Sequence, residues 1–150
     1  MTKLTIATIL LITAGHCVGG QELNSFGAEL PIIRTAAERN KCTGDLFYIF
    51  LAIRKAENGG DRRQFGIIHP RCEKQMDLRP NDTLDIQAGW SAATVVKNHK
   101  RWIKAGRPKD FIGFLADRYC PVGAKNDPNG LNKNWQKNVR YWYRRLKCQP

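Results

Sequence analysis

The chain has 150 residues, of which 42% are hydrophobic and 25% charged, a composition typical of a folded globular protein rather than a disordered one. Its 25 lysines and arginines outnumber 13 acidic residues, which gives a formal net charge of +12. This charge favours polyanionic partners, namely nucleic acid, an anionic membrane or an acidic cell-wall polymer, over basic ones.

The first twenty residues have the pattern of an export signal. Lys3 precedes an apolar stretch at 4–14 that is too short to span a bilayer comfortably, and small residues follow up to Gly20. We therefore expect residues 1–20 to be a cleaved signal peptide and residues 21–150 to be a secreted or periplasmic chain. The alternative is an uncleaved N-terminal anchor helix. Export counts against nucleic acid, so we expect no nucleic-acid partner.

Four cysteines remain once the signal is removed: Cys42, Cys72, Cys120 and Cys148. An even number in a small exported chain predicts two disulfides, and three pairings are open. Zinc is the rival interpretation, but His69 and Cys72 have no CxxC or HxxxH pair beside them. We expect no metal and no organic cofactor.

Five segments of the mature chain have helical features, at residues 31–40, 45–56, 84–105, 108–119 and 134–146. The segment 45–56 is apolar around most of its circumference, which predicts a central, buried helix ended by Gly59 and Gly60. Residues 61–81 show no sustained helical period and read as loops or a short hairpin. We expect one domain, mainly α, of about five helices with a small irregular or β region.

One carboxylate, Glu57, ends the apolar helix in the sequence "AENGG" at 56–60, and "FGIIHP" follows at 65–70. A carboxyl at the edge of an apolar core can have a raised pKa, because burial disfavours its charge, and a raised pKa suits a general acid. The glycines allow a sharp turn and a close approach to the backbone. The alternative is an ordinary solvated residue at a helix end.

The order of these motifs resembles the lysozyme-like superfamily, in particular lytic transglycosylases and phage-type domains that degrade peptidoglycan. In that superfamily a buried helix ends at a catalytic Glu, often followed by Ser-Gly-Gly, and a Gly-Leu-Met-Gln-Ile type segment lines the cleft. Here Asn58, Ile68 and His69 depart from the pattern. Residues 85–102 resemble the long helix behind the cleft, and 114–139, with its Asn-Asp-Pro, resembles the ending of small phage-type members.

The resemblance implies an α+β lysozyme-like fold that cleaves the β-1,4 bond between N-acetylmuramic acid and N-acetylglucosamine in peptidoglycan glycan strands. It makes Glu57 the general acid/base, and the substrate-binding candidates are Gly66, Ile67, Tyr119, Asn126 and Asp127. The alternative for the last two is that they only shape a turn-rich loop. His69 and His99 are better interpreted as structural than as catalytic residues.

The sequence leaves hydrolase and transglycosylase open. A hydrolase usually needs a second carboxylate, and Asp61 is the nearest in sequence, with Asp77, Asp82 and Asp85 further away. A lytic transglycosylase needs only the glutamate, which acts first as acid and then as base while the sugar's own 6-hydroxyl attacks. The lack of an obvious partner favours the transglycosylase.

Two rival functions remain from the sequence. One is a non-catalytic, lysozyme-like module that binds the cell wall. The other is a cationic protein that binds membranes or nucleic acid, because residues 134–147 interleave aromatic and basic side chains. That segment can also be an amphipathic helix whose aromatics pack inward while its cations are solvated. We expect a monomer with at most peripheral contact with anionic wall or membrane.

Overall fold

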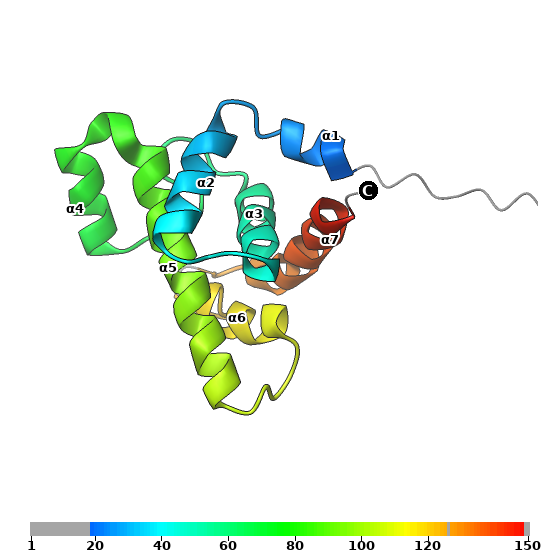
Figure 1. Ribbon diagram of the computed structural model, residues 1–150. Helices are drawn as coiled ribbons and strands as arrows, with labels where there is room; N and C mark the ends of the chain where they lie inside the picture. Colours follow the sequence, from blue (N-terminus) through cyan, green and yellow to red (C-terminus); the bar gives the residue numbers. More distant parts are fainter. Residues whose placement is uncertain (1–18, 126, 149–150) are drawn as a thin grey trace, which may run out of the picture.

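The computed structural model describes residues 19–125 and 127–148, and this part of the chain is mainly helical, as predicted (Figure 1). The helices are α1 (Gly19–Asn24), α2 (Glu29–Arg39), α3 (Asp45–Glu57), α4 (Pro70–Leu78), α5 (Thr83–Lys104), α6 (Phe111–Tyr119) and α7 (Trp135–Lys147). Two short 3-10 helices, η1 (Pro80–Asp82) and η2 (Leu131–Asn134), precede α5 and α7. No described helix is both long enough and apolar enough to cross a membrane.

The expected count of five helices is wrong, since the described residues form seven, and no strand or hairpin occurs among them. The additional helices are α1 and α4. The loop prediction for 61–81 missed α4, which begins at Pro70 and is capped by His69, whose Nδ1 accepts the N–H of Arg71 at 3.2 Å. Only Cys72 and Met76 of α4 are buried, so nine residues were too few to show a helical period.

The predicted signal peptide lies largely outside the described residues. Only its last two residues, Gly19 and Gly20, fall within them, at the start of α1.

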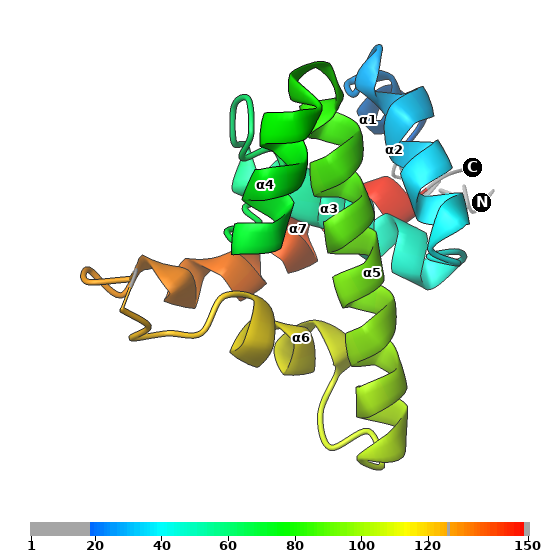
Figure 2. The same ribbon diagram turned by 90° about the vertical axis from the view of Figure 1, so that its left-hand side faces the viewer.

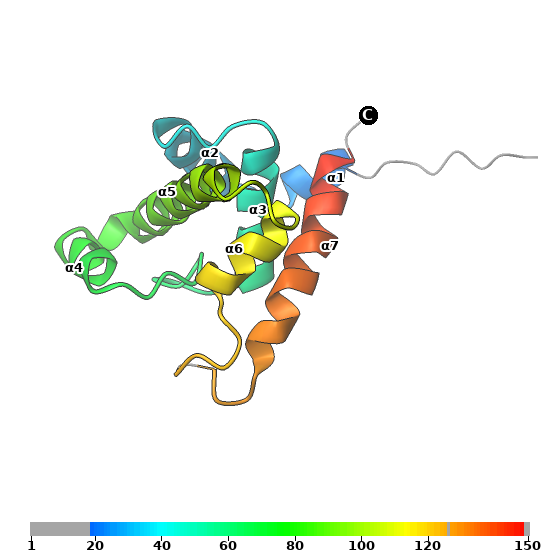
Figure 3. The same cartoon turned by 90° about the horizontal axis from the view of Figure 1, so that it is seen from below.

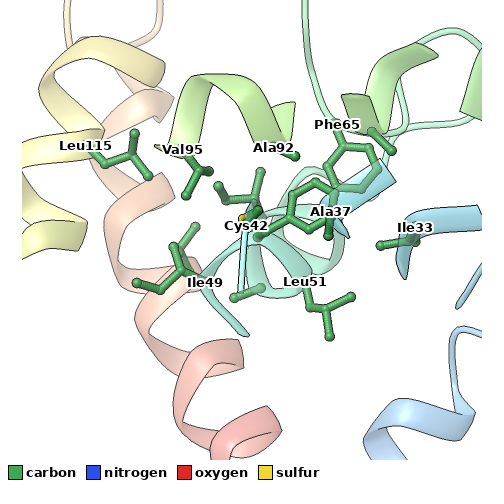
Figure 4. Close-up of a cluster of buried hydrophobic side chains, with 14 of the residues drawn as sticks. Ile33, Ala37, Cys42, Ile49, Leu51, Phe65, Ala92, Val95 and Leu115 are labelled. Atoms are coloured by element: carbon green, nitrogen blue, oxygen red, sulfur yellow. The ribbon is translucent and has the colours of Figure 1, made fainter. Parts of the chain in front are cut away.

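Helix α3 is the centre of the molecule, as its sequence predicted. Five consecutive residues, 49–53, are at most 5% exposed, so neighbours cover the helix on every side. Figure 4 shows the surrounding side chains converging from α2, α5, α6 and the segment after α3, namely Ile33, Ala37, Phe65, Ala92, Val95 and Leu115. The rings of Phe50 and Phe65 stack with centroids 4.8 Å apart, which fixes that segment on the core.

A second, smaller cluster lies between α4 and the first half of α5, which run side by side in Figure 2. It consists of Cys72, Met76 and Ile86, with Ile67 and Trp90 packed against it. Ile67 also packs against the main core, so the segment before α4 joins the two clusters.

The predicted disulfides are wrong for this structure, in which Cys42, Cys72, Cys120 and Cys148 are all free thiols. Cys42 fills space in the main core and donates its S–H to the carbonyl of Leu46 at 3.4 Å, whereas Cys72 belongs to the second cluster. Burial raises the pKa of Cys42 to about 12 and that of Cys120 to about 11. These two therefore remain protonated thiols at neutral pH.

Helix α7 packs its apolar residues inward, as the amphipathic interpretation of 134–147 predicted. Trp135, Val139 and Leu146 are buried, and Tyr141 is exposed. Several of the helix's cations pair with acids of other elements: Arg140 with Asp110, Lys147 with Asp45, and Arg145 with Glu22. The interleaved aromatics thus serve packing at least as much as any surface.

Candidate active site

Glu57 is the last residue of α3, and the helix ends there because Asn58 adopts a left-handed conformation, with φ of 44°. The residue is half-buried. Its Oε1 accepts a hydrogen bond of 2.7 Å from the indole Nε1–H of Trp135, the first residue of α7. The end of one core helix and the beginning of another therefore meet at this carboxyl.

The backbone of Gly66 also lies against the carboxyl of Glu57. A Cβ at this position would fall 2.6 Å from Cδ of Glu57, nearer than real carbon atoms approach, and its nearest atom would be Oε2. The glycine also has φ of +67°, in the left-handed region. Both observations require glycine here, so this residue of the "FGI" motif is placed directly against Glu57.

Burial raises the pKa of Glu57 above its ordinary value, because charge is disfavoured away from water. The hydrogen bond from Trp135 acts in the opposite direction, since it stabilises the ionised carboxylate, but it is the smaller effect. The carboxyl is therefore protonated over a wider pH range than an exposed glutamate, which a general acid requires.

Gln87 holds the segment 65–67 in place from α5. Its side chain is fully buried, and its Oε1 accepts the N–H groups of Phe65 at 3.4 Å and Ile67 at 3.2 Å. Its Nε2 donates to the carbonyl of Ile67 at 3.0 Å. One side-chain amide thus satisfies three backbone groups that a neighbouring strand would satisfy in a sheet. This explains how the segment is ordered without a strand in the described chain.

Tyr119, at the end of α6, binds the same segment from the other side. Its hydroxyl donates to the carbonyl of Phe65 at 2.7 Å and lies 2.9 Å from the hydroxyl of Ser91. Its ring stacks on that of Trp135, with centroids 5.2 Å apart and planes 25° from parallel. Burial, and then the charge of Glu57, raise the pKa of Tyr119 well above 10, so it stays a neutral donor. The structure thus places Tyr119 beside Glu57, with its hydroxyl bound inside the protein.

Asp127 organises the loop that leads to Trp135. It is buried, and its two carboxylate oxygens accept the backbone N–H groups of Gly123 and Asn132, each at 3.2 Å. Asn132 also donates its side-chain N–H to the carbonyl of Pro121 at 2.9 Å. These contacts fit the loop-shaping alternative for Asp127, while Asn126 lies outside the described residues.

The four candidates for a second catalytic carboxylate are engaged elsewhere. Asp61 accepts the hydroxyl of Thr83 at 2.5 Å, and this hydrogen bond is the main reason why the pKa of Asp61 is lowered. Asp77 pairs with Arg62 of the loop, Asp82 pairs with Arg79, and Asp85 pairs with Arg39 at 2.8 Å. Glu57, by contrast, has a pKa that burial raises.

Gly59, the first glycine of the turn after Glu57, is required by the packing of the turn. A Cβ on Gly59 would collide with the backbone of Arg63, coming within 2.6 Å of the carbonyl carbon. Gly60 faces open space. Arg62 and Arg63 both pair with Glu73 and so tie the turn to α4. The turn is thereby fixed on the second cluster rather than left as a hinge.

Sequence reasoning found Glu57, Gly66, Ile67 and Tyr119, which the structure brings together, but it missed Trp135 and Gln87 as parts of the site. The one available signal for Gln87 is a polar residue among the buried positions of α5. Two cavities, of about 620 and 420 Å³, are lined by other residues. His69 stacks on Trp90 and His99 packs against Phe111, as structural histidines do.

Comparisons of the chain with protein-family models, curated proteins and solved structures found no match. The geometry around Glu57 and the order of the motifs are therefore the observations that bear on function.

Proposed function

We propose that this protein is an exported enzyme that cleaves the β-1,4 bond between N-acetylmuramic acid and N-acetylglucosamine in peptidoglycan glycan strands, with Glu57 as general acid/base. The observation that carries the proposal is the state of this carboxyl. It is half-buried with a raised pKa, bound at one oxygen by a neutral indole and faced by a residue with no side chain. An acid that must donate a proton near neutral pH needs such surroundings.

Transglycosylase chemistry fits the site better than hydrolysis. In the first step Glu57 gives its proton to the glycosidic oxygen as the bond from that oxygen to C1 of the muramic acid breaks. In the second step the carboxylate takes the proton of the 6-hydroxyl as that oxygen bonds to C1, and a 1,6-anhydro sugar forms. One carboxyl suffices and no water is consumed. Asp61, Asp77, Asp82 and Asp85 are all engaged in other contacts, which supports the single-acid route.

Exposed apolar side chains near the site support a sugar substrate. Ile68, Val122 and Leu131 are 65%, 64% and 62% exposed, and each lies within four residues of Gly66, Tyr119 or Trp135 in the sequence. Figure 3 shows their segments, the stretch before α4 and the loop between α6 and α7, on the same side of the molecule. Apolar surface of this kind suits the faces of sugar rings. The net charge of +12 favours accumulation on an anionic wall.

The test is mass spectrometry of the fragments that the purified protein releases from peptidoglycan. Wild type should release 1,6-anhydromuramyl ends, and Glu57→Gln should release none. Glu38→Gln is the matched control, because Glu38 is exposed on α2, and it should retain full activity. No product from wild type, together with retained wall binding, would refute the enzyme and leave the non-catalytic binding module.

The same assay separates the two reactions. Reducing muramic acid ends that disappear in Glu57→Gln would indicate a hydrolase. Asp61→Asn would then show whether Asp61 is the second carboxylate, since a transglycosylase should keep its cleavage activity in any Asp61→Asn protein that folds.

A further inference from the structure

Trp135 forms a hydrogen bond to the proposed catalytic carboxyl, and its indole N–H can act only as the donor. An indole N–H donates and has no acceptor capacity, whereas a carboxyl oxygen can either accept or carry a proton. Oε1 of Glu57 receives the indole N–H at 2.7 Å. When Glu57 is neutral, its proton therefore lies on Oε2. This is the oxygen that a Cβ on Gly66 would approach most closely.

The indole itself is held firmly. Trp135 is 6% exposed, and its ring stacks on Tyr119, whose hydroxyl is bound to the carbonyl of Phe65 and to Ser91 of α5. The stacking partner of the indole is thus itself held by α5 and by the segment that carries Gly66. Burial and this stacking restrain the ring, and with it the direction of the indole N–H.

We propose that Trp135 is a positioning residue that assigns the acidic proton of Glu57 to Oε2 and thereby selects the oxygen that donates to the substrate. This inference rests on the proposed function of Glu57 as general acid. It goes further, because it gives the two oxygens of one carboxyl different roles and makes Trp135 responsible for the difference.

The hydrogen bond from Trp135 also affects the pH dependence of Glu57. A hydrogen bond from a neutral donor is stronger to a carboxylate than to a carboxylic acid, so removing it favours the protonated form. The loss should raise the pKa of Glu57 by about one unit. The titratable groups that the charge of Glu57 reaches are Tyr119 and Cys120, whose own pKa values are well above 10 and about 11. Neither changes its charge at acidic or neutral pH, so neither contributes to the titration of Glu57.

The variant Trp135→Phe keeps an aromatic ring against Tyr119 and removes the N–H. The matched control is Trp102→Phe, because the Trp102 indole donates to the carbonyl of Lys109 at a similar 2.7 Å, away from Glu57. The primary measurement is an NMR titration of the ¹³C-labelled Glu57 carboxyl without substrate. We expect an upward shift of about one unit in Trp135→Phe and none in Trp102→Phe. An unmoved titration in folded Trp135→Phe would overturn the inference.

A second measurement needs no change at Trp135. The indole ¹⁵N–¹H signal of Trp135 should titrate with Glu57 in wild type and become independent of pH in Glu57→Gln. A signal that does not titrate in wild type would also overturn the inference, even if Trp135→Phe failed to fold.

Measurements of cleavage activity distinguish a failure of the role of Trp135 from a failure of the proposed function. The basic limb of the pH–rate profile should move upward in Trp135→Phe by the same amount as the NMR titration, while that of Trp102→Phe stays in place. A shifted titration in a protein without cleavage activity would refute the proposed function but retain the hydrogen-bond role. An active enzyme whose Glu57 titration does not move would refute the positioning role alone.

Discussion

Replacement of Gly66 by alanine tests the contact between the backbone and the carboxyl most directly. The added methyl group would lie 2.6 Å from Cδ of Glu57 and 3.0 Å from Oε1. Because the backbone of the segment is fixed by Gln87 and Tyr119, the carboxyl must move instead. Such a movement breaks the 2.7 Å hydrogen bond from Trp135.

The magnitude has two parts. The first is the backbone cost, since φ of +67° disfavours a residue with a Cβ by about 1–2 kcal/mol, offset by about 0.4–1 kcal/mol because alanine restricts the unfolded chain. The second is the lost hydrogen bond to the carboxyl, worth about 1–3 kcal/mol. Gly66→Ala should therefore lower the free energy of unfolding by about 1–4.5 kcal/mol.

Gly106→Ala is the matched control. Gly106 has a similar φ of +74°, but a Cβ there would meet nothing within 4 Å. It should lose only the net backbone cost, about 1.5 kcal/mol or less. The assay is urea unfolding by linear extrapolation, with peptidoglycan cleavage measured in parallel. We expect cleavage to be lost in Gly66→Ala and kept in Gly106→Ala. Equal stability losses in the two variants, or full cleavage by Gly66→Ala, would refute the reasoning.

Two further predictions follow from the same site. Gln87→Met keeps the shape of the side chain but leaves the N–H groups of Phe65 and Ile67 and the carbonyl of Ile67 without their partner, so urea unfolding should show a loss of about 3 kcal/mol. The exposed Gln75→Met should lose much less, and equal losses would contradict the role of Gln87. Burial raises the pKa of Glu57 above 4.5, so the native state binds the proton more tightly than the unfolded state, and ionisation destabilises the fold as the pH rises above that value. Thermal unfolding should therefore show that Glu57→Gln is more stable than wild type at pH 7. The difference in stability should vanish below pH 4. A difference that does not depend on pH would show that the glutamate carries no burial penalty.

Local sequence patterns were sufficient for the central helix and its terminal acid. The apolar residues of 45–56 cover most of the helix circumference, which predicted a central, buried helix, and the structure buries 49–53 without a gap. Where such a helix ends, its last polar residue can lie either at the border of the core or in solvent. The order of the motifs favoured the border of the core for Glu57 and placed the glycine of "FGI" near it.

The rest of the site could not be predicted because its contacts are distant in the sequence. The bond between Trp135 and Glu57 joins residues 78 positions apart, and that between Tyr119 and Phe65 joins residues 54 apart. In the sequence, nothing distinguished Trp135 from the other aromatic residues of an amphipathic helix. Cysteine counting failed for a related reason: an even number says nothing about position, and Cys42 and Cys72 are buried in different clusters.

The surroundings of Glu57 are neutral in a chain that is strongly basic. A lysine or arginine beside the carboxyl would lower its pKa and keep it ionised, and an ionised acid has no proton to donate. The cations nearest in sequence are directed elsewhere: Arg54 pairs with Glu29, Arg63 pairs with Glu73, and Lys55 lies over the ring of Phe26. Within the described chain, only burial and the Trp135 indole shift the pKa of Glu57.

The separation of charge from the site has a functional reason if the substrate is an anionic polymer. Attraction at long range depends on the net charge of +12, which acts over the whole surface and weakens with salt. Proton donation depends on the few ångströms around Glu57, where an indole, a glycine and a tyrosine hold the carboxyl without charge. Added salt should therefore weaken binding to the wall and leave the pKa of Glu57 nearly unchanged, because its main cause is burial rather than a neighbouring ion.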